Sequence, residues 1–249
     1  MPARAVFETN LTGRDWVVGD IHGCFATLDL ALVEIGFDSS RDRLFSVGDL
    51  VDRGPESGRA LEYLRKPWFH AVRGNHEQML LDAADENPRK LYLWWANGGV
   101  WFVEESEEMQ AALKASIAAL PLVIEVDTPA GAVGIVHADV PKKMSWPVFV
   151  EALEGGDPKT VETALWGRNR AMGRVRRGVE GVGRVFCGHT PMMGGIRSIG
   201  NVFCIDTGAV YGLTQGYAEA SLAIMELTGN QAHRQAVINP THLMPEKVW

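Results

Sequence analysis

The stretch Trp16-Val17-Val18-Gly19-Asp20-Ile21-His22-Gly23 decides the fold. An apolar, β-rich run is followed by glycine and then by polar side chains, and the same order returns over residues 44–49 and 68–76. Between these runs, residues 28–35 and 61–64 carry apolar side chains at helical spacing. The order strand, helix, strand, helix, strand favours a parallel α/β sheet.

The rest of the chain adds antiparallel pairing, so we expect a mixed α/β fold. A turn signature at 127–131 predicts a hairpin, and Asp157-Pro158 predicts a helix that begins there and runs to about Arg168. Residues 79–120 look helical. The further expected strands lie at residues 122–126, 132–136, 184–187, 201–205 and 221–227. With no repeat and no clear linker, we expect one domain over 1–249, with a core of about 15–227 and a polar tail at 228–249.

Composition excludes several classes of protein. Lys plus Arg number 24 and Asp plus Glu number 31, and the net charge of −7 argues against a nucleic-acid-coating protein. Three scattered cysteines suit a reducing compartment. No signal peptide is expected at the N-terminus, and no run approaches the ~18 apolar residues of a membrane span. We therefore expect a cytoplasmic protein that binds neither membrane nor nucleic acid; its oligomeric state cannot be inferred.

Five segments place polar side chains directly after an apolar run. In open α/β sheets, ligands bind beyond the carboxyl ends of strands, so we expect the five to meet at one edge. The segments are Gly19–Gly23, Gly48–Gly54, Gly74–Glu77, Val136–Asp139 and Gly188–Pro191. The candidate ligands that they collect are Asp20, His22, Asp49, Asn75, His137 and His189.

This donor set indicates a pair of divalent metal ions. It mixes oxygen and nitrogen without a thiolate, which suits manganese, iron or zinc and is too rich in imidazole to favour calcium or magnesium. Six side chains exceed the need of one tetrahedral site, and two metals that share one carboxylate fit the count better. Metals paired at ~3.5–4 Å activate a water and stabilise both oxygens of an in-line phosphoryl displacement.

The neighbouring motif residues suit the same reaction. Arg53 and Arg73 adjoin candidate ligands, and guanidinium groups match phosphate oxygens. His76 follows Asn75 and is free to protonate the leaving alkoxide. Asp52 would accept the other imidazole N–H and fix the tautomer and orientation of His76.

Together these segments resemble the phosphoprotein phosphatase family of metallophosphoesterases, within it the bacteriophage-lambda-type and bacterial serine/threonine protein phosphatases. The resemblance covers roughly residues 15–213 and holds the family's order. Besides the five segments, it is carried by Asn97–Phe102, Leu120–Leu122 and Ile205–Val210. It implies two mixed sheets packed as a double β-sheet sandwich with helices outside, and the site at the strand ends.

The resemblance also implies roles. Asp20, His22 and Asp49 would hold the first metal. The bridging Asp49, with Asn75, His137 and His189, would hold the second, manganese being the first choice for both sites. Asp52 and His76 would form the acid dyad, while Arg53 and Arg73 would bind phosphate, with Asn75 also near it. Trp166-Gly167-Arg168 makes Arg168 a further phosphate ligand, although the family usually has asparagine at the middle position.

The implied activity is hydrolysis of phosphoserine and phosphothreonine monoesters in a protein or peptide, by direct attack of a water that two metals activate. An alternative is a symmetrical dinucleoside polyphosphate (diadenosine tetraphosphate) hydrolase, a group that typically has Ala in place of Asp52 and Asp in place of Glu77. A non-catalytic metal-holding or phosphopeptide-binding protein would be expected to lack a ligand, the acid or an arginine. Away from the motifs, we expect Glu77 to favour the positive end of a helix, the aromatics of 92–102 to pack in the core, and the arginines of 170–177 to be solvated.

Overall fold

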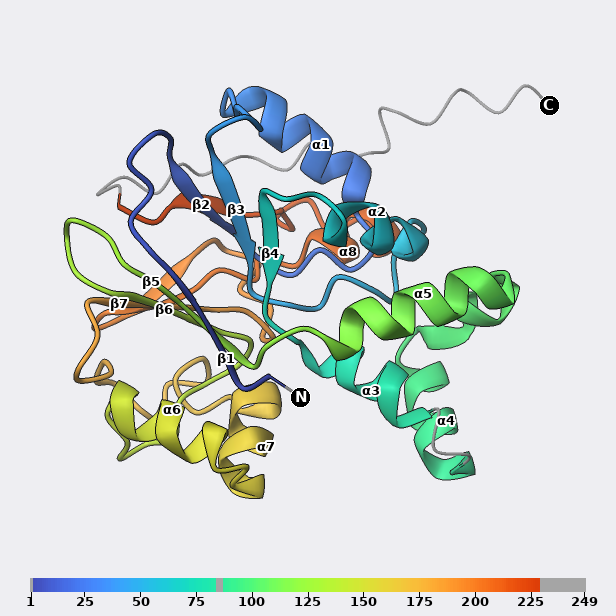
Figure 1. Cartoon of the computed structure of the whole chain (residues 1–249). Helices are drawn as coiled ribbons and strands as arrows, with labels where there is room; N and C mark the ends of the chain where they lie inside the picture. Colours follow the sequence, from blue (N-terminus) through green and yellow to red (C-terminus); the bar gives the residue numbers. More distant parts are fainter. Residues whose placement is uncertain (1, 84–86, 229–249) are drawn as a thin grey trace.

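Two β-sheets face each other in the computed structural model, which describes residues 2–83 and 87–228 (Figure 1). The smaller sheet has the order β10-β2-β3-β4 and the larger β1-β5-β6-β7-β9-β8. The smaller sheet comprises β2 (Asp15–Val18), β3 (Arg43–Ser46), β4 (Phe69–Ala71) and β10 (Ile224–Glu226). The larger comprises β1 (Arg4–Phe7), β5 (Val123–Val126), β6 (Val133–Val136), β7 (Arg184–Cys187), β8 (Arg197–Ile199) and β9 (Val202–Cys204). This is the mixed double-sheet architecture expected from the sequence.

The pairing agrees with the sequence patterns. Strands β2, β3 and β4 are parallel neighbours, as the alternation of strands and helices predicts. Strands β5 and β6 form the predicted antiparallel pair, with Val123 opposite Val136. The sheets become mixed because β10 runs antiparallel to β2 and β8 antiparallel to β9.

Side-chain alternation along the strands builds three apolar layers. In β2, Val17 points between the sheets while Trp16 and Val18 face the helices outside. From the other sheet, Ile135 and Phe186 join Val17 in the central layer. Burying one face of each sheet against the other fixes their register, because a slip by one residue would expose the whole row.

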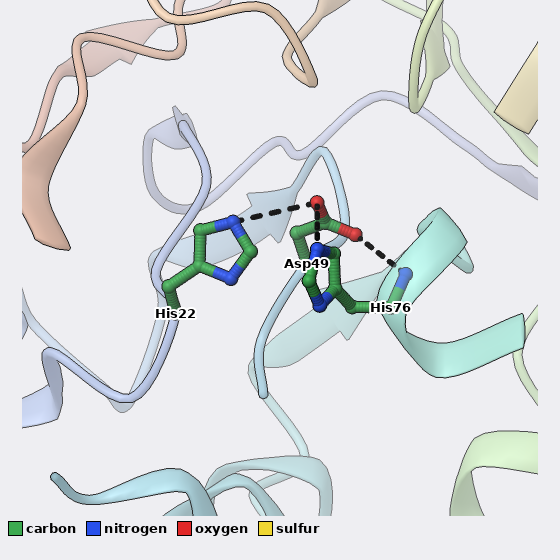
Figure 2. A group of neighbouring side chains, drawn as sticks. All are labelled: His22, Asp49 and His76. Carbon is green, nitrogen blue, oxygen red and sulfur yellow. Dashed lines mark hydrogen bonds and ion pairs between the residues drawn. The ribbon is translucent and has the colours of Figure 1, made fainter. Parts of the chain in front are cut away.

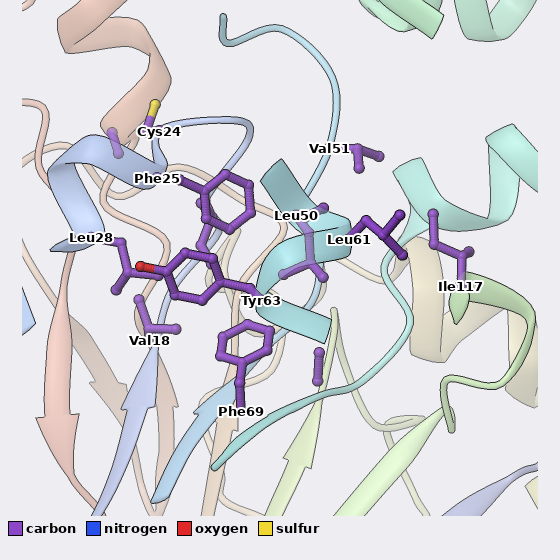
Figure 3. Close-up of a cluster of buried hydrophobic side chains, with 14 of the residues drawn as sticks. Val18, Cys24, Phe25, Leu28, Leu50, Val51, Leu61, Tyr63, Phe69 and Ile117 are labelled. Atoms are coloured by element: carbon purple, nitrogen blue, oxygen red, sulfur yellow. The ribbon is translucent and has the colours of Figure 1, made fainter. Parts of the chain in front are cut away.

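Helices cover the outer face of the smaller sheet. They are α1 (Phe25–Glu34), α2 (Ala60–Leu64) and α8 (Ala209–Gln215), with the 3₁₀ turn η1 (Ser57–Arg59). Helices α3 (Asn75–Ala83), α4 (Pro88–Ala96) and α5 (Glu107–Ala118) pack on one another beyond β4, together with the 3₁₀ turn η2 (Gly99–Glu104) (Figure 1). The apolar cluster beneath α1 and α2 centres on three aromatic rings in contact, with Phe25 and Tyr63 tilted at 4.8 Å and Tyr63 and Phe69 edge-to-face at 5.3 Å between ring centroids (Figure 3).

Helices α6 (Trp146–Glu154) and α7 (Pro158–Trp166) cover the larger sheet (Figure 1). Helix α7 begins as predicted, because the Asp157 carboxylate accepts the N–H of Thr160 and Pro158 needs no such partner. The sequence analysis missed β1, β8, α6 and α8, and the described part of the expected helical stretch 79–120 forms three helices and a 3₁₀ turn. Within the described ranges, the structure contains no helix that could cross a bilayer. The expected tail lies outside these ranges, apart from residue 228.

Candidate active site

The carboxyl ends of five strands meet at one edge of the two sheets. The loops after β2 and β3 carry Asp20, His22 and Asp49, and the first turn of α3, which follows β4, carries Asn75 and His76. The loops after β6 and β7 carry His137 and His189. Ligand atoms of His22, Asp49 and His76 lie within 4.8 Å of one another, as do those of Asp49, His137 and His189. Asp49 belongs to both groups, so the two sets of donors adjoin across one carboxylate.

The first group surrounds one oxygen of Asp49 (Figure 2). Its Oδ2 is 3.5 Å from His22 Nε2 and 4.0 Å from His76 Nε2, and its Oδ1 accepts the backbone N–H of His76 at 3.0 Å. His22 Nδ1 lies 2.9 Å from the carbonyl of Val51, which assigns the ring proton to Nδ1. The lone pair of His22 Nε2 therefore faces Asp49.

In the second group, electron-pair donors crowd together. His137 Nδ1 is 2.8 Å from the carbonyl of Val47, which leaves Nε2 without a proton. That Nε2 lies 2.8 Å from Asn75 Oδ1, 3.2 Å from His189 Nδ1 and 3.4 Å from Asp49 Oδ1. Since at most one proton, on His189, can be shared among these atoms, the arrangement suits a cation that all four contact.

Burial also shifts the pKa values of the carboxyl groups in this site. It raises the pKa of Asp20, with repulsion from Asp206 and Asp49 adding to the effect. Burial likewise raises the pKa of Asp206 to about 7, with Asp49 again contributing. For Asp49 itself, burial is outweighed by His137, His76 and His22, which hold its pKa well below the usual range. Buried carboxylates placed this close favour a divalent counter-ion.

The histidines are ready to bind a metal. Burial lowers the pKa of His22 and His137, and it lowers that of His189 to about 2, so these rings are neutral at pH 7. Neutral imidazole is the form that binds metals. The residues present therefore fit a pair of divalent ions.

The Asp20 carboxylate is held in place by a backbone N–H group. Both of its carboxylate oxygens accept the N–H of His189, at 2.9 and 3.2 Å, so the loops after β2 and β7 are tied together. A Cβ on Gly188 would lie 1.9 Å from Asp20 Oδ1, and glycine is therefore required at this position. Asp20 is thereby held beside the backbone of His189, and its carboxylate belongs to neither of the two groups of ligand atoms.

Arg53 and Arg168 lie where a phosphate could reach them. Arg53 Nη1 is 2.7 Å from His22 Nε2, so a metal at that nitrogen requires the flexible guanidinium to turn away. Arg168 is exposed at the rim, 3.4 Å from Thr190 Oγ1, and its positive charge helps to lower the pKa of His137 and His189.

The guanidinium of Arg73 lies at the end of α5, and its phosphate-binding role stays a prediction. The side chain is 2% exposed. Its guanidinium donates to Gln78 Oε1 and to the carbonyls of Ile117, Ala118 and Leu120 at the end of α5. Arg73 therefore satisfies the carbonyls that a helix C-terminus leaves unpaired.

The Asp52–His76 pair is fully buried. Asp52 Oδ2 lies 2.7 Å from His76 Nδ1, and both side chains are 0% exposed. His76 Nε2 has no hydrogen-bond partner among the described residues and lies toward Asp49. The imidazole of His76 is thus held at Nδ1, and Nε2 can contact a ligand in the site.

Glu77 does more than favour the start of a helix. Its buried carboxylate accepts backbone N–H groups from Asp49, Leu50 and Gly74, at 2.8 to 2.9 Å, and a longer one from Val51 at 3.3 Å. Glu77 thus organises the loop that carries Asp49. Burial raises its pKa to about 7, and the nearby Asp49 charge acts in the same direction.

Backbone strain is concentrated at this site. In the described chain, the non-glycine residues with positive φ are His22, Asp49, Asp52, Arg53 and His189, with φ between 45° and 72°. Such conformations cost of order 1–3 kcal/mol each and persist where surrounding contacts enforce them. Their coincidence with the candidate ligands is an independent sign of a functional site.

Sequence reasoning missed several contributors. Asp206 follows β9 just as the other acids follow their strands, a signal that could have found it. Trp94 and Trp101 donate their indole N–H groups to Asp52, which no spacing rule foretells. Arg170 is 2% exposed and pairs with Asp139 at 2.5 Å, so the expectation that it is solvated was wrong.

Comparisons with known proteins agree with this picture. The family model for calcineurin-like phosphoesterases matches residues 14–193. Serine/threonine-protein phosphatase 1 of Salmonella typhimurium is 42% identical over 201 residues, which cover 79% of this chain and 87% of that protein. A symmetrical bis(5'-nucleosyl)-tetraphosphatase of Hamiltonella defensa is 41% identical, but over 69 residues only, 27% of this chain and 25% of the relative. The solved structure of a protein serine/threonine phosphatase from Saccharomyces cerevisiae shares the fold, with a TM-score of 0.53 at 19% identity over 82% of this chain and 70% of that one.

Proposed function

The chain belongs to the calcineurin-like phosphoesterase family, and on this premise we propose that it hydrolyses phosphoserine and phosphothreonine monoesters in proteins or peptides. The observation that carries the proposal is the buried Asp52–His76 pair beside Asp49. The dinucleoside polyphosphate hydrolases typically have alanine in place of Asp52. The long match to a protein phosphatase supports the same choice.

Two divalent ions, which we propose to be manganese, with iron or zinc as alternatives, would supply an activated water and neutralise charge on the phosphate. The first would be held by Asp20, His22 and Asp49, and the second by Asp49, Asn75, His137 and His189. Arg53 and Arg168 would bind phosphate oxygens through their guanidinium groups, and Asn75 would lie beside them. The location that we propose is the cytoplasm.

His76 is the proposed general acid. Its Nε2 is buried and without a hydrogen-bond partner in the described part of the chain, so it can donate a proton to the leaving oxygen. Asp52 holds the opposite N–H at 2.7 Å and fixes the direction in which Nε2 points. General acids of this kind contribute typically 10²–10⁴-fold to the rate.

The test is a substrate panel with manganese: an aryl phosphate, a phosphoserine peptide and diadenosine tetraphosphate. We expect the peptide to be hydrolysed and His76→Asn to lower kcat for it by about 10²-fold or more while metal content is retained. His70→Asn is the matched control, because the His70 ring packs between Phe7 and Phe45, away from the ligand groups. Faster cleavage of the dinucleotide than of the peptide would reverse the assignment, and no turnover of any substrate would refute it.

A further inference from the structure

The Asp52 carboxylate is held by more than its histidine. It is 0% exposed and receives three N–H donors. His76 Nδ1 and Trp94 Nε1 lie 2.7 and 2.9 Å from Oδ2, and Trp101 Nε1 lies 2.8 Å from Oδ1. The two indoles come from α4 and η2, more than 40 residues along the chain. Both oxygens are therefore fixed in place, and the plane of the carboxylate is set by the two indole donors.

Two glycines allow the indoles to reach Asp52. A Cβ on Gly99 would lie 2.3 Å from ring atoms of Trp94, so any larger residue would displace that indole. Gly98 has a φ of 104°, and a Cβ there would lie 2.7 Å from the backbone nitrogen of Arg53. The sequence Asn97-Gly98-Gly99 thus lets the chain turn tightly against the loop that carries Asp52 and Arg53.

We propose that Trp94 and Trp101 are positioning residues for the general acid, an inference that rests on the proposed function. An indole N–H only donates, and it keeps its proton throughout the reaction. With both oxygens accepting these N–H groups, Asp52 cannot rotate, and its bond to His76 Nδ1 holds the imidazole with Nε2 toward the leaving oxygen. Because Asp52 is closed to solvent, water cannot replace a lost indole donor.

The test uses Trp94→Phe, Trp101→Phe and the double variant, since phenylalanine keeps a six-membered aromatic ring and removes the N–H donor together with the five-membered part of the indole. Trp95→Phe is the matched control: it lies on the same helix and is 39% exposed. Each protein is assayed on a phosphoserine peptide, whose alkoxide needs protonation, and on p-nitrophenyl phosphate, whose leaving group does not.

We expect each single variant to lower kcat for the peptide about 10-fold, and the double variant further, with KM within twofold and p-nitrophenyl phosphate turnover within threefold of wild type. Equal losses on both substrates, or no loss on either, would overturn the proposal. Gly99→Ala should reproduce the selective loss of Trp94→Phe, and Trp101→Phe alone carries the test if the double variant does not fold. Wild-type protein without activity on either substrate would instead refute the proposed function.

Discussion

Replacing Arg73 tests whether the structure or the sequence pattern describes this residue correctly. Its guanidinium lies 2.8 Å from the carbonyl of Ala118, 3.1 Å from Gln78 Oε1 and 3.3 Å from the carbonyl of Leu120. Arg73→Met keeps the apolar stem and removes these bonds. We therefore expect a loss of stability at the end of α5 and little change in phosphate binding.

The magnitude follows from these contacts. A hydrogen bond to a charged group contributes about 1.5–3 kcal/mol, and the bonds are not additive because they share one cation. Burial lowers the pKa of Arg73, which shows that keeping the charge inside has a cost, and this cost disappears in the variant. The expected net loss is about 2–4 kcal/mol. In a chain of this size that corresponds to a fall in Tm of roughly 4–16 °C.

The assay compares unfolding in urea with kinetics well below Tm. For Arg73→Met, the free energy of unfolding should fall by the stated amount, while KM for an aryl phosphate and inhibition by inorganic phosphate stay within twofold. Arg53→Met should do the reverse, with KM raised about 10-fold and stability nearly unchanged. If Arg73→Met weakens phosphate inhibition 10-fold with unfolding unaltered, the assignment of Arg73 to the end of α5 is refuted.

Three further outcomes are expected. Removing metal with a chelator should lower the stability by about 3 kcal/mol for each occupied site, relative to protein in manganese at 100 times its Kd, and an unchanged Tm would argue against the metal centre. Burial lowers the pKa of His70 to about 4, so on acidification the unfolded chain binds this proton before the folded chain does, and the free energy of unfolding should fall as the pH drops from about 6.5 to 4. For this partly buried ring we expect a fall of about 1–2 kcal/mol. The variant His70→Phe should be less sensitive to acid, and the His70 ring should titrate in NMR with a midpoint near 4. Glu77→Gln should reduce manganese affinity by 10-fold or more in a calorimetric titration, because an amide offers one acceptor oxygen to the loop N–H groups instead of two; equal affinity would show that Glu77 does not organise the ligand loop.

The helices and strands that depend mainly on neighbouring residues could be predicted from the sequence. Trp16–Val18 is a continuous apolar run, and such a run predicts a strand that is buried on both faces, as this one is. Asp157-Pro158 marked the start of α7 because capping needs only neighbouring residues. Strand β1 was missed because its residues are only half-buried, and it exists through its parallel pairing with β5, more than 100 residues away.

The candidate site was likewise predicted only in part. Each candidate ligand was found because it follows a strand, and the structure brings these ends together. The direction of a long side chain is a different matter. Arg73 and Arg53 both adjoin candidate ligands in sequence, yet one guanidinium reaches α5 and the other reaches His22. That choice depends on where α5 ends relative to β4, which no motif around Arg73 records.

The strained residues explain why the site needs the whole fold. His22, Asp49, Asp52, Arg53 and His189 adopt positive φ at a cost of order 1–3 kcal/mol each, a total comparable with the stability of an ordinary domain. Contacts from distant segments must offset this cost: Glu77 and the two indoles hold the loop after β3, and Asp20 holds His189. A short peptide carrying the same motif would relax to extended or helical backbone and lose the ligand geometry. The motifs therefore determine which atoms can bind a metal. The two packed sheets and the α4–η2 segment determine that these atoms lie close enough to bind it at the same time.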